Sequence, residues 1–163
     1  MTYTAAIITL SDSRAEKGGK DLSKEVIEEI LTSFDFNVVS YTLLPDDAQK
    51  LKAALMDLCD KGINFVVTTG GTGMSLRDIT PETTKEVIDR EIPGVAEAMR
   101  RNGLKYTNRA ILTRGICGIR EKTVILNLPG SPKACRENLE FIIEPLVHGI
   151  GTLNGTVSDC GRK

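Results

Sequence analysis

The residues "INFVVTTGGTGMSLRDITPETT", numbers 63–84, contain the transition that decides the fold. The run 63–69, which is apolar or β-branched except for Asn64, is typical of a strand that is buried on both faces. Three glycines follow within four positions, and Thr80-Pro81 then has the pattern of a helix start. A buried strand that leads through a tight turn into a helix is the repeating unit of a parallel α/β sheet.

Two further strand and helix units precede this stretch. The segments 5–10 and 37–44 predict strands, and each is followed by apolar residues at helical spacing. Asp21 is expected to cap the first of these helices, and Gly62 is expected to end the second. Alternating elements of this kind predict a parallel sheet with right-handed crossovers.

The second half of the chain contains two helix patterns and then two short strands. Because proline suits the first turn of a helix and glycine its exit, helices are predicted over about 81–90 and over 93–103. The segments 116–119 and 123–127 flank the short polar turn 120–122 and can pair only as an antiparallel hairpin. The sheet should therefore be mixed and not purely parallel.

A long helix is expected after Ser131-Pro132, with Pro145 kinking or dividing it. The chain has 163 residues and contains no internal repeat, low-complexity tract or linker. These patterns predict a single domain, residues 1–163, with a three-layer α/β/α architecture around a mostly parallel, mixed central sheet.

Composition and charge exclude several functions. A net charge of −1 provides no basic face for nucleic acid, and the absence of a signal pattern or a membrane-length apolar run predicts a cytoplasmic protein. The four scattered cysteines form no C-x-x-C pair, which argues against a zinc site. The single histidine, His148, is expected at the end of the last helix, so a Ser-His-Asp or Cys-His mechanism is not favoured.

Ligands of an open parallel sheet collect at the carboxyl ends of its strands. Four segments are predicted there: 11–14, 45–47, the stretch 68–84 that follows the third strand, and 129–132. In the third of them, glycines allow positive φ and let main-chain N–H groups converge on an anion. Neither a Walker A loop nor a G-x-G-x-x-G turn is present, so a tight turn that only packs the strand on the helix is the competing interpretation.

Two aspartates stand beside these turns. Thr80 is expected to cap the helix that follows, so Asp78 is not needed as a cap. A carboxylate close to phosphate requires a cation between them, and Mg²⁺ is the usual one. Asp46 is the candidate partner across the cleft, although Asp46 with Gln49 also resembles a capping box. Asp47 is interpreted as a first-turn acid.

The segment Pro129-Gly130-Ser131-Pro132 has the same pattern of glycine turn, hydroxyl cap and proline. It could form a second cradle opposite the first glycine turn, or it could serve structure alone. Asp12 by itself is most often a turn residue in such a place. Arg77 and Lys133 are interpreted as solvated charges that lie near suspected ligand loops.

Taken together, the segments resemble the molybdenum-cofactor biosynthesis proteins of the MogA/MoaB type. The glycine turn with Arg77-Asp78-Ile79-Thr80-Pro81-Glu82 resembles the family signature, and the similarity extends over nearly the whole chain. The other matching segments are Leu10-Ser11-Asp12-Ser13-Arg14, Leu44-Pro45-Asp46-Asp47, Ile92-Pro93-Gly94, Thr113-Arg114-Gly115 with Gly118, and Leu128-Pro129-Gly130-Ser131-Pro132. One departure is visible, because this chain has Lys24 where many relatives carry the glycine of Asp-x-Ser-Gly.

The resemblance implies a molybdopterin adenylyltransferase that uses MgATP and releases pyrophosphate, with the molybdopterin-binding fold, usually as a trimer. It further implies that a molybdenum insertase acts downstream as a possible partner. It assigns turnover and Mg²⁺ placement to Asp46 and Asp78. The residues that it implies for pterin and nucleotide binding are Ser11, Asp12, Thr69, Gly70, Gly71, Thr72, Gly73, Pro129, Gly130 and Ser131.

Two other functions compete with this interpretation. A paralogue or carrier that holds molybdopterin without turnover would keep the same glycine turns, but the presence of both aspartates favours the enzyme. A nucleotide pyrophosphate hydrolase would need an activated water, for which no base other than the same aspartates is available. Transfer of an adenylyl group needs alignment and charge neutralisation, and no nucleophile from the protein.

Overall fold

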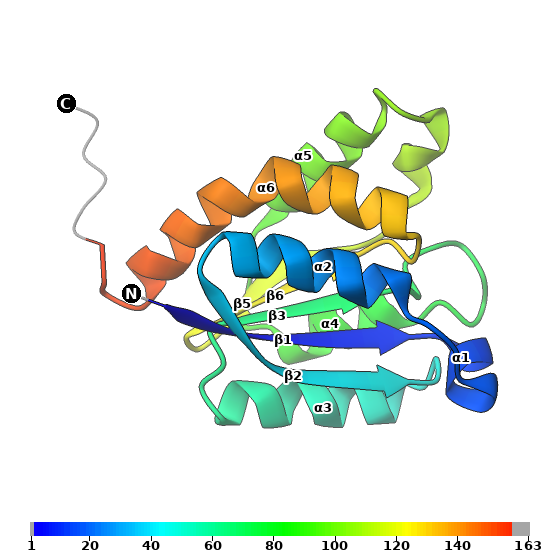
Figure 1. The fold of residues 1–163 in the computed structure, drawn as a ribbon, viewed down its shortest axis with the longest axis horizontal. Coiled ribbons are helices and arrows are strands. Elements are labelled where there is room, and N and C mark those ends of the chain that lie inside the picture. The colour runs from blue at the N-terminus through cyan, green and yellow to red at the C-terminus, as the bar shows by residue number, and fades with distance from the viewer. Residues whose placement is uncertain (1, 158–163) are drawn as a thin grey trace.

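The computed structural model describes residues 2–157, and its centre is a six-stranded sheet with helices on both faces (Figure 1). The elements in chain order are β1 (Tyr3–Leu10), α1 (Asp12–Lys17), α2 (Leu22–Ser33), β2 (Phe36–Leu44), α3 (Ala48–Asp60), β3 (Phe65–Thr69), α4 (Thr80–Val87), β4 (Arg90–Glu91), α5 (Pro93–Gly103), the 3₁₀ helix η1 (Asn108–Leu112), β5 (Cys117–Arg120), β6 (Thr123–Leu128) and α6 (Pro132–Leu153).

The strand order β2-β1-β3-β6-β5-β4 confirms the prediction of a mixed, mostly parallel sheet. Strands β2, β1, β3 and β6 are parallel, whereas β5 is antiparallel to both β6 and β4. All five residues of β3 are buried, because this strand lies between β1 and β6 and is covered on both faces. The carboxyl ends of the four parallel strands therefore lie at one edge of the sheet.

The side chains of β1 and β3 alternate between two hydrophobic cores. Ile7 and Phe65 pack with α2, α5 and α6 on one face, and Ile8 and Val66 pack with α3 and α4 on the other. Figure 1 shows these layers, with α2, α5 and α6 above the sheet and α3 below it. Each fully buried Ile, Leu or Phe contributes roughly 1.5–3 kcal/mol relative to an exposed one, so the layers are held by burial.

The helix predicted to end at about Arg90 ends at Val87, and Arg90 lies in the short edge strand β4 instead. The prediction was wrong at this end because the backbone leaves the helix to pair with β5. Asp89 N donates to Ile119 O at 2.7 Å, beside the antiparallel ladder. A strand of two residues carries too little apolar pattern to be visible in the sequence.

Pro145 does not divide the last helix, since α6 continues to Leu153. His148 and Gly149 consequently lie inside this helix, and the prediction that the histidine stands at its end was wrong. Packing explains the continuation, because Leu146 and Ile150 on either side of the histidine are buried in the core. No helix within residues 2–157 combines the length and the apolar character that crossing a membrane requires.

Candidate active site

Four turns meet at the carboxyl edge of the parallel strands. Ser11 N, after β1, donates to Leu44 O at the end of β2 at 2.9 Å, and Gly70 N, after β3, donates to Leu128 O at the end of β6 at 3.2 Å. A Cβ atom at Gly130 would lie 3.5 Å from Gly70 Cα, so the two glycine turns are adjacent. The structure thus brings together the four segments that the sequence placed at this edge.

The glycines of the first turn make room for specific neighbours. Gly70 has φ +94°, and a Cβ atom there would lie 2.3 Å from the main-chain oxygen of Leu10. Gly71 has φ +66°, and its Cβ would lie 3.0 Å from Asp46 Oδ1. At Gly73 the corresponding distance to Asp78 Oδ2 is 2.9 Å. The turn therefore lies directly against both predicted carboxylates, which is more than strand and helix packing requires.

Thr80 does not cap α4, contrary to the prediction. Ile79, which has no polar side chain, occupies the N-cap position. The buried Thr80 Oγ1 instead donates to Gly70 O at 2.9 Å, and Thr80 N donates to Gly71 O at 3.1 Å. The threonine thus holds the glycine turn onto the first residue of the helix.

Asp12 and Asp46 exchange hydrogen bonds across the edge of the sheet. Asp46 N donates to Asp12 Oδ1 at 2.9 Å, and Asp12 N donates to Asp46 Oδ2 at 3.3 Å. Asp46 Oδ1 is buried and has no hydrogen-bond partner among residues 2–157. A buried carboxylate oxygen without a partner is costly, unless a cation or a ligand donor completes its coordination. Asp12 belongs to the short helix α1, whereas the sequence favoured a turn residue.

The interpretation of Asp46 as a helix cap was wrong by one residue. Asp47 is the N-cap of α3, and its side chain accepts from Lys50 N at 3.0 Å. Asp47 is therefore also not the first-turn acid that the sequence suggested. Two consecutive aspartates look alike as caps in a sequence, and only the extended backbone of Asp47 identifies it. Asp46 is thereby left to face the glycine turn.

The pKa of Asp46 lies above its ordinary value of 3.8. Burial raises this pKa most, the hydrogen bond with the Asp12 amide opposes the rise, and the charges of Asp12 and Asp78 add to it. Because the folded protein favours the neutral form of Asp46, this residue contributes to the free energy of unfolding. The contribution is complete below pH 3.8, the ordinary pKa of the carboxyl. That contribution is lost as the pH rises through the higher pKa of the folded state.

We expect Asp46→Asn to be more thermostable than the wild type at pH 7, by about 1–2 °C, which corresponds to roughly 0.5 kcal/mol. The asparagine removes an ionised carboxylate from beside two like charges and keeps an oxygen for the Asp12 amide. Thermal unfolding at pH 7 and again near pH 3.5 tests this, because the difference should shrink at the lower pH. A variant less stable than the wild type at pH 7 would contradict the electrostatic account.

Arg114 holds both ends of the loop that carries Asp78. Its Nε donates to Gly73 O at 2.6 Å and its Nη2 to Asp78 O at 2.8 Å, while its main-chain N donates to Thr72 O at 2.9 Å. It also forms an ion pair with Glu82 in the first turn of α4. The sequence placed Arg114 only within a matching segment and did not indicate this contact, which joins residues about 40 positions apart.

Replacing Arg114 with alanine is expected to loosen the segment 73–78 and to lower stability by about 2–3 kcal/mol, since several hydrogen bonds from a charged group are lost. Hydrogen–deuterium exchange followed by mass spectrometry should show faster exchange in this segment. Arg136→Ala is the matched control, because Arg136 is also ion-paired but lies on α6. Equal exchange of the segment in wild type and Arg114→Ala would show that the clamp is unimportant.

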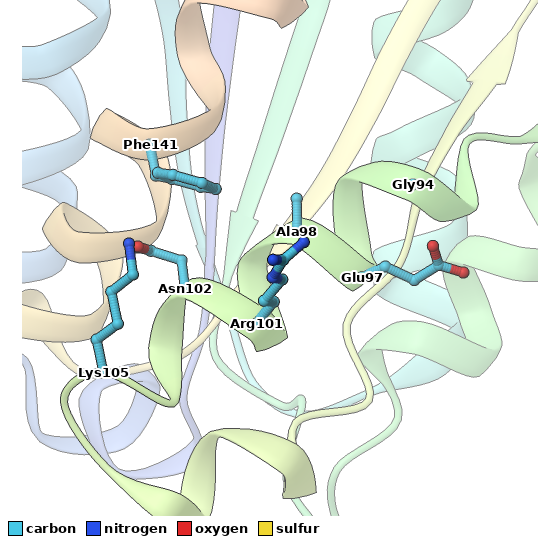
Figure 2. A pocket seen from close by; sticks show the side chains of 7 residues that line it. All are labelled: Gly94, Glu97, Ala98, Arg101, Asn102, Lys105 and Phe141. Carbon is cyan, nitrogen blue, oxygen red and sulfur yellow. The ribbon is translucent and has the colours of Figure 1, made fainter.

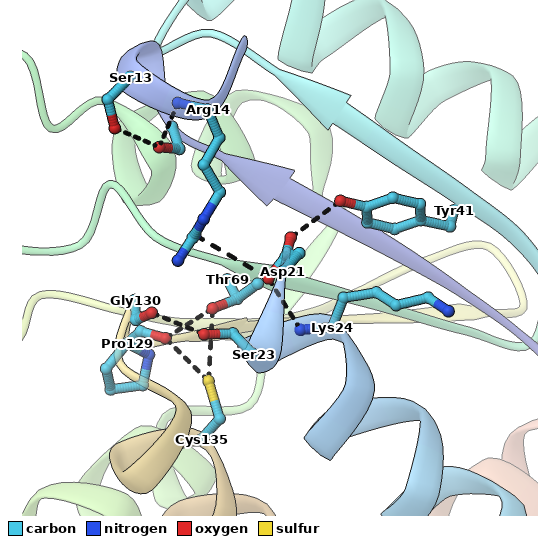
Figure 3. A network of polar contacts seen from close by, with 11 residues as sticks. Ser13, Arg14, Asp21, Ser23, Lys24, Tyr41, Thr69, Pro129, Gly130 and Cys135 are labelled. Atoms are coloured by element: carbon cyan, nitrogen blue, oxygen red, sulfur yellow. Dashed lines mark hydrogen bonds and ion pairs between the residues drawn. The ribbon is translucent and has the colours of Figure 1, made fainter. Parts of the chain in front are cut away.

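The main-chain oxygens of the Pro129-Gly130 turn accept hydrogen bonds from three side chains (Figure 3). Thr69 Oγ1 donates to Pro129 O at 2.7 Å, Ser23 Oγ donates to Gly130 O at 2.8 Å, and Cys135 Sγ also donates to Pro129 O, at 3.0 Å. The predicted site residue Thr69 is buried and thus supports the turn from the interior of the protein. Ser23 was not among the predicted residues, and only its place in the Asp-x-Ser pattern pointed to it.

Each of two polar residues at this edge caps a helix. Ser131 caps α6 by accepting from Ala134 N at 3.2 Å, and Ser11 caps α1 by accepting from Arg14 N at 3.3 Å. Asp21 caps α2 as predicted, by accepting at 3.0 Å from the main-chain N of Lys24, the residue that replaces the glycine of the Asp-x-Ser-Gly pattern.

A cleft of about 560 Å³ opens between the two glycine turns. Seven of the predicted site residues line it, and four further residues line it as well. The predicted ones are Gly71, Thr72, Gly73, Asp78, Pro129, Gly130 and Ser131, and the others are Met74, Arg109, Leu112 and Thr113. Asp46 stands behind Gly71, and Ser11, Asp12, Thr69 and Gly70 lie in the supporting turns. The sequence did not predict η1, which contributes Arg109 and Leu112.

A second hollow, of about 490 Å³, lies at α5 and α6 (Figure 2). It is lined by Gly94, Glu97, Ala98, Arg101, Asn102, Lys105 and Phe141. It contains none of the predicted site residues and no turn at the carboxyl end of a parallel strand. The cleft between the glycine turns is therefore the candidate site.

The cysteines of the described residues offer no reactive thiolate. Cys59, Cys117 and Cys135 are free and buried, and burial raises the pKa of Cys117 to about 12 and that of Cys135 to about 11. Cys160 lies outside the described residues. Within residues 2–157 no group of three or more His, Cys, Asp or Glu side chains is placed to hold a metal. A metal at the cleft would consequently need ligands from a substrate in addition to the aspartates.

The fold and the cleft together define an α/β protein with a candidate ligand site at the carboxyl edge of its sheet. The chain belongs to the family described as "Probable molybdopterin binding domain", whose model matches residues 6–149. It is 40% identical over 166 residues to a molybdopterin adenylyltransferase of Helicobacter pylori strain J99, which covers 99% of this chain and 94% of the relative. It is 37% identical over 159 residues to that of Escherichia coli K12, covering 91% and 80%.

Solved structures confirm the predicted fold. The crystal structure of the molybdopterin biosynthesis enzyme MoaB from Thermus thermophilus superposes with a TM-score of 0.89 at 42% identity, covering 94% of this chain and 98% of that one. The molybdopterin biosynthesis Mog protein from Mycobacterium ulcerans gives a TM-score of 0.89 at 34% identity, covering 93% and 99%. The resemblance to MogA/MoaB-type proteins is thereby confirmed.

Proposed function

We propose that this protein is a molybdopterin adenylyltransferase that joins the AMP part of MgATP to molybdopterin. The observation that carries the proposal is the position of Asp46 and Asp78, which lie against Gly71 and Gly73 of one glycine turn. The names of the relatives, which match nearly the whole chain, support the same activity.

In the proposed reaction a terminal phosphate oxygen of molybdopterin attacks the α-phosphorus of ATP. A new phosphorus–oxygen bond forms, the bond from the α-phosphorus to the bridging oxygen breaks, and pyrophosphate leaves with the bonding electrons. The protein supplies no nucleophile, and its contribution is alignment together with charge neutralisation. The glycine turn and the Pro129-Gly130-Ser131 turn would hold the phosphates and the pterin on the two sides of the cleft.

The residues at the cleft fit a magnesium ion. Asp46 Oδ1 is a buried oxygen without a partner within residues 2–157, and carboxylate and phosphate oxygens are the ligands that Mg²⁺ prefers. We assign Asp46 and Asp78 to hold the ion together with substrate oxygens. When bound, Mg²⁺ would neutralise charge on the phosphates during transfer. The two carboxylates would hold the ion at the cleft.

We further propose a cytoplasmic homotrimer that passes its product to a downstream molybdenum insertase. These three statements rest on the resemblance to the family. The trimer is tested by light scattering of the purified chain, for which a monomer mass would be the contradicting result.

Incubation of the protein with ATP, Mg²⁺ and molybdopterin tests the proposed activity. Mass spectrometry should detect adenylylated molybdopterin, with pyrophosphate released in equal amount, and chelation of the metal should stop both. Binding of the pterin without any product would support the carrier interpretation instead.

A further inference from the structure

Arg77 forms a two-pronged ion pair across the edge of the sheet. Its Nε and Nη2 donate to Asp12 Oδ2 and Oδ1, each at 3.0 Å. The acceptor Asp12 is the residue that exchanges hydrogen bonds with Asp46. The guanidinium therefore contacts the carboxylates of the candidate site through Asp12, although the sequence suggested only a solvated charge.

Three carboxylates act on this guanidinium. Asp12, Asp46 and Asp47 all raise the pKa of Arg77, with the hydrogen bond to Asp12 as the largest cause. Asp78, the next residue along the chain, acts on Asp46. Arg77 thus lies against this acidic edge and donates to one of its carboxylates.

The ion pair between Arg77 and Asp12 is exposed and therefore weak. The side chain of Arg77 is 65% exposed, and the neighbouring Leu76 is 100% exposed, so the described chain leaves this part of the loop open to solvent. Exposed ion pairs contribute only about 0–1 kcal/mol, so a stronger charge can displace one partner. Arg114 meanwhile fixes the ends of the loop at Gly73 and Asp78, so Arg77 can move without moving Asp78 far.

We propose that Arg77 is an exchangeable counter-ion. It neutralises Asp12 and Asp46 until a divalent cation and a nucleotide bind. Its side chain then leaves Asp12 and forms an ion pair with a phosphate of that nucleotide. This inference rests on the proposed function, because it takes the cleft to be the nucleotide site. Arg77 is a suitable residue for the transfer, since a guanidinium binds carboxylate and phosphate with the same two-pronged geometry.

The proposal makes two predictions of opposite sign for Arg77→Gln. Without nucleotide, the dissociation constant of Mn²⁺ should fall about tenfold, because the substitution removes a repulsive positive charge. A single charge about 6 Å from a divalent ion in a water-like medium weakens binding of that ion about tenfold. With Mg²⁺ present, the dissociation constant of α,β-methylene-ATP should rise about tenfold, because one charged hydrogen-bonding contact is lost. Isothermal titration calorimetry measures both constants without any turnover.

Two control variants separate the possible outcomes. Arg136→Gln makes the same change in net charge on α6 and should alter neither constant. Arg77→Lys keeps the charge but not the fork, so Mn²⁺ affinity should stay near the wild-type value. If the substitution only disordered the loop, the affinity for both Mn²⁺ and nucleotide would fall, and that result overturns the proposal. Unchanged affinity for Mn²⁺ or for the nucleotide also overturns it.

The Asp46→Asn variant distinguishes failure of this inference from failure of the proposed function. If Asp46→Asn weakens Mn²⁺ binding while Arg77→Gln does not tighten it, the metal site stands and the counter-ion role falls. If the wild type and Asp46→Asn bind Mn²⁺ equally, or neither binds it, the metal is not held at this cleft and both proposals fall.

Discussion

Asp78→Ala is expected to lower kcat by about 10²–10³, which corresponds to about 3–4 kcal/mol, while the protein remains folded. The side chain lies at the rim of the cleft, where Asp78 Oδ2 accepts from Ser75 N at 2.9 Å and leaves its other oxygen for a ligand. Loss of a preorganised charge from a site that works by charge neutralisation removes stabilisation of the transition state directly. Steady-state assays with MgATP and molybdopterin, with circular dichroism as the check on folding, give the answer.

Asp78→Asn separates the charge from the local structure. An asparagine oxygen can still accept from Ser75 N, so a loss of similar size in this variant would identify the charge as the cause. The exposed Asp60, at the end of α3, provides the control, and Asp60→Ala should leave kcat unchanged. Near-normal turnover by a folded Asp78→Ala protein would remove this carboxylate from the mechanism.

Gly70→Ala is expected to produce the largest loss of stability, roughly 2–6 kcal/mol, as strained backbone and overpacking combine. The new Cβ would lie 2.3 Å from Leu10 O, a main-chain atom of the central sheet that cannot move aside, at a φ of +94°. Urea unfolding monitored by circular dichroism measures the change. The melting temperature should fall by about 5–20 °C.

Gly62→Ala is the matched control for this substitution. Gly62 also has positive φ, +71°, but a Cβ atom there would have nothing within 4 Å. Only the cost of the left-handed conformation, about 1–2 kcal/mol, should then appear. If both variants lost the same stability, the close approach of the glycine turn to the end of β1 would have no energetic importance.

The order of strands and helices could be predicted because it depends on local pattern. The buried run 63–69, the glycine after it and the short turn 120–122 each determine their own element and its direction. The mixed sheet followed, since two runs that close together can pair only as a hairpin. The end of α4 could not be predicted, because pairing of Arg90 with β5 decides it from a distance.

In the candidate site, too, features set by local sequence could be predicted and long-range contacts could not. Glycines and aspartates that follow strands could be selected because every parallel strand points its carboxyl end to one edge. The clamp by Arg114 and the pairing of Arg77 with Asp12 could not, since these contacts join residues about 40 and 65 positions apart. Capping errors at Thr80 and Asp47 arose because a cap depends on the φ and ψ of one residue.

Anomalous diffraction from crystals that contain Mn²⁺ and α,β-methylene-ATP tests the central claim most directly. If two carboxylates and two glycine turns form one nucleotide site, the manganese peak should lie between Asp46 and Asp78, with the phosphates over the glycine turn at Gly70-Gly71. Manganese away from both aspartates, or phosphates bound in the hollow at α5 and α6, would contradict it.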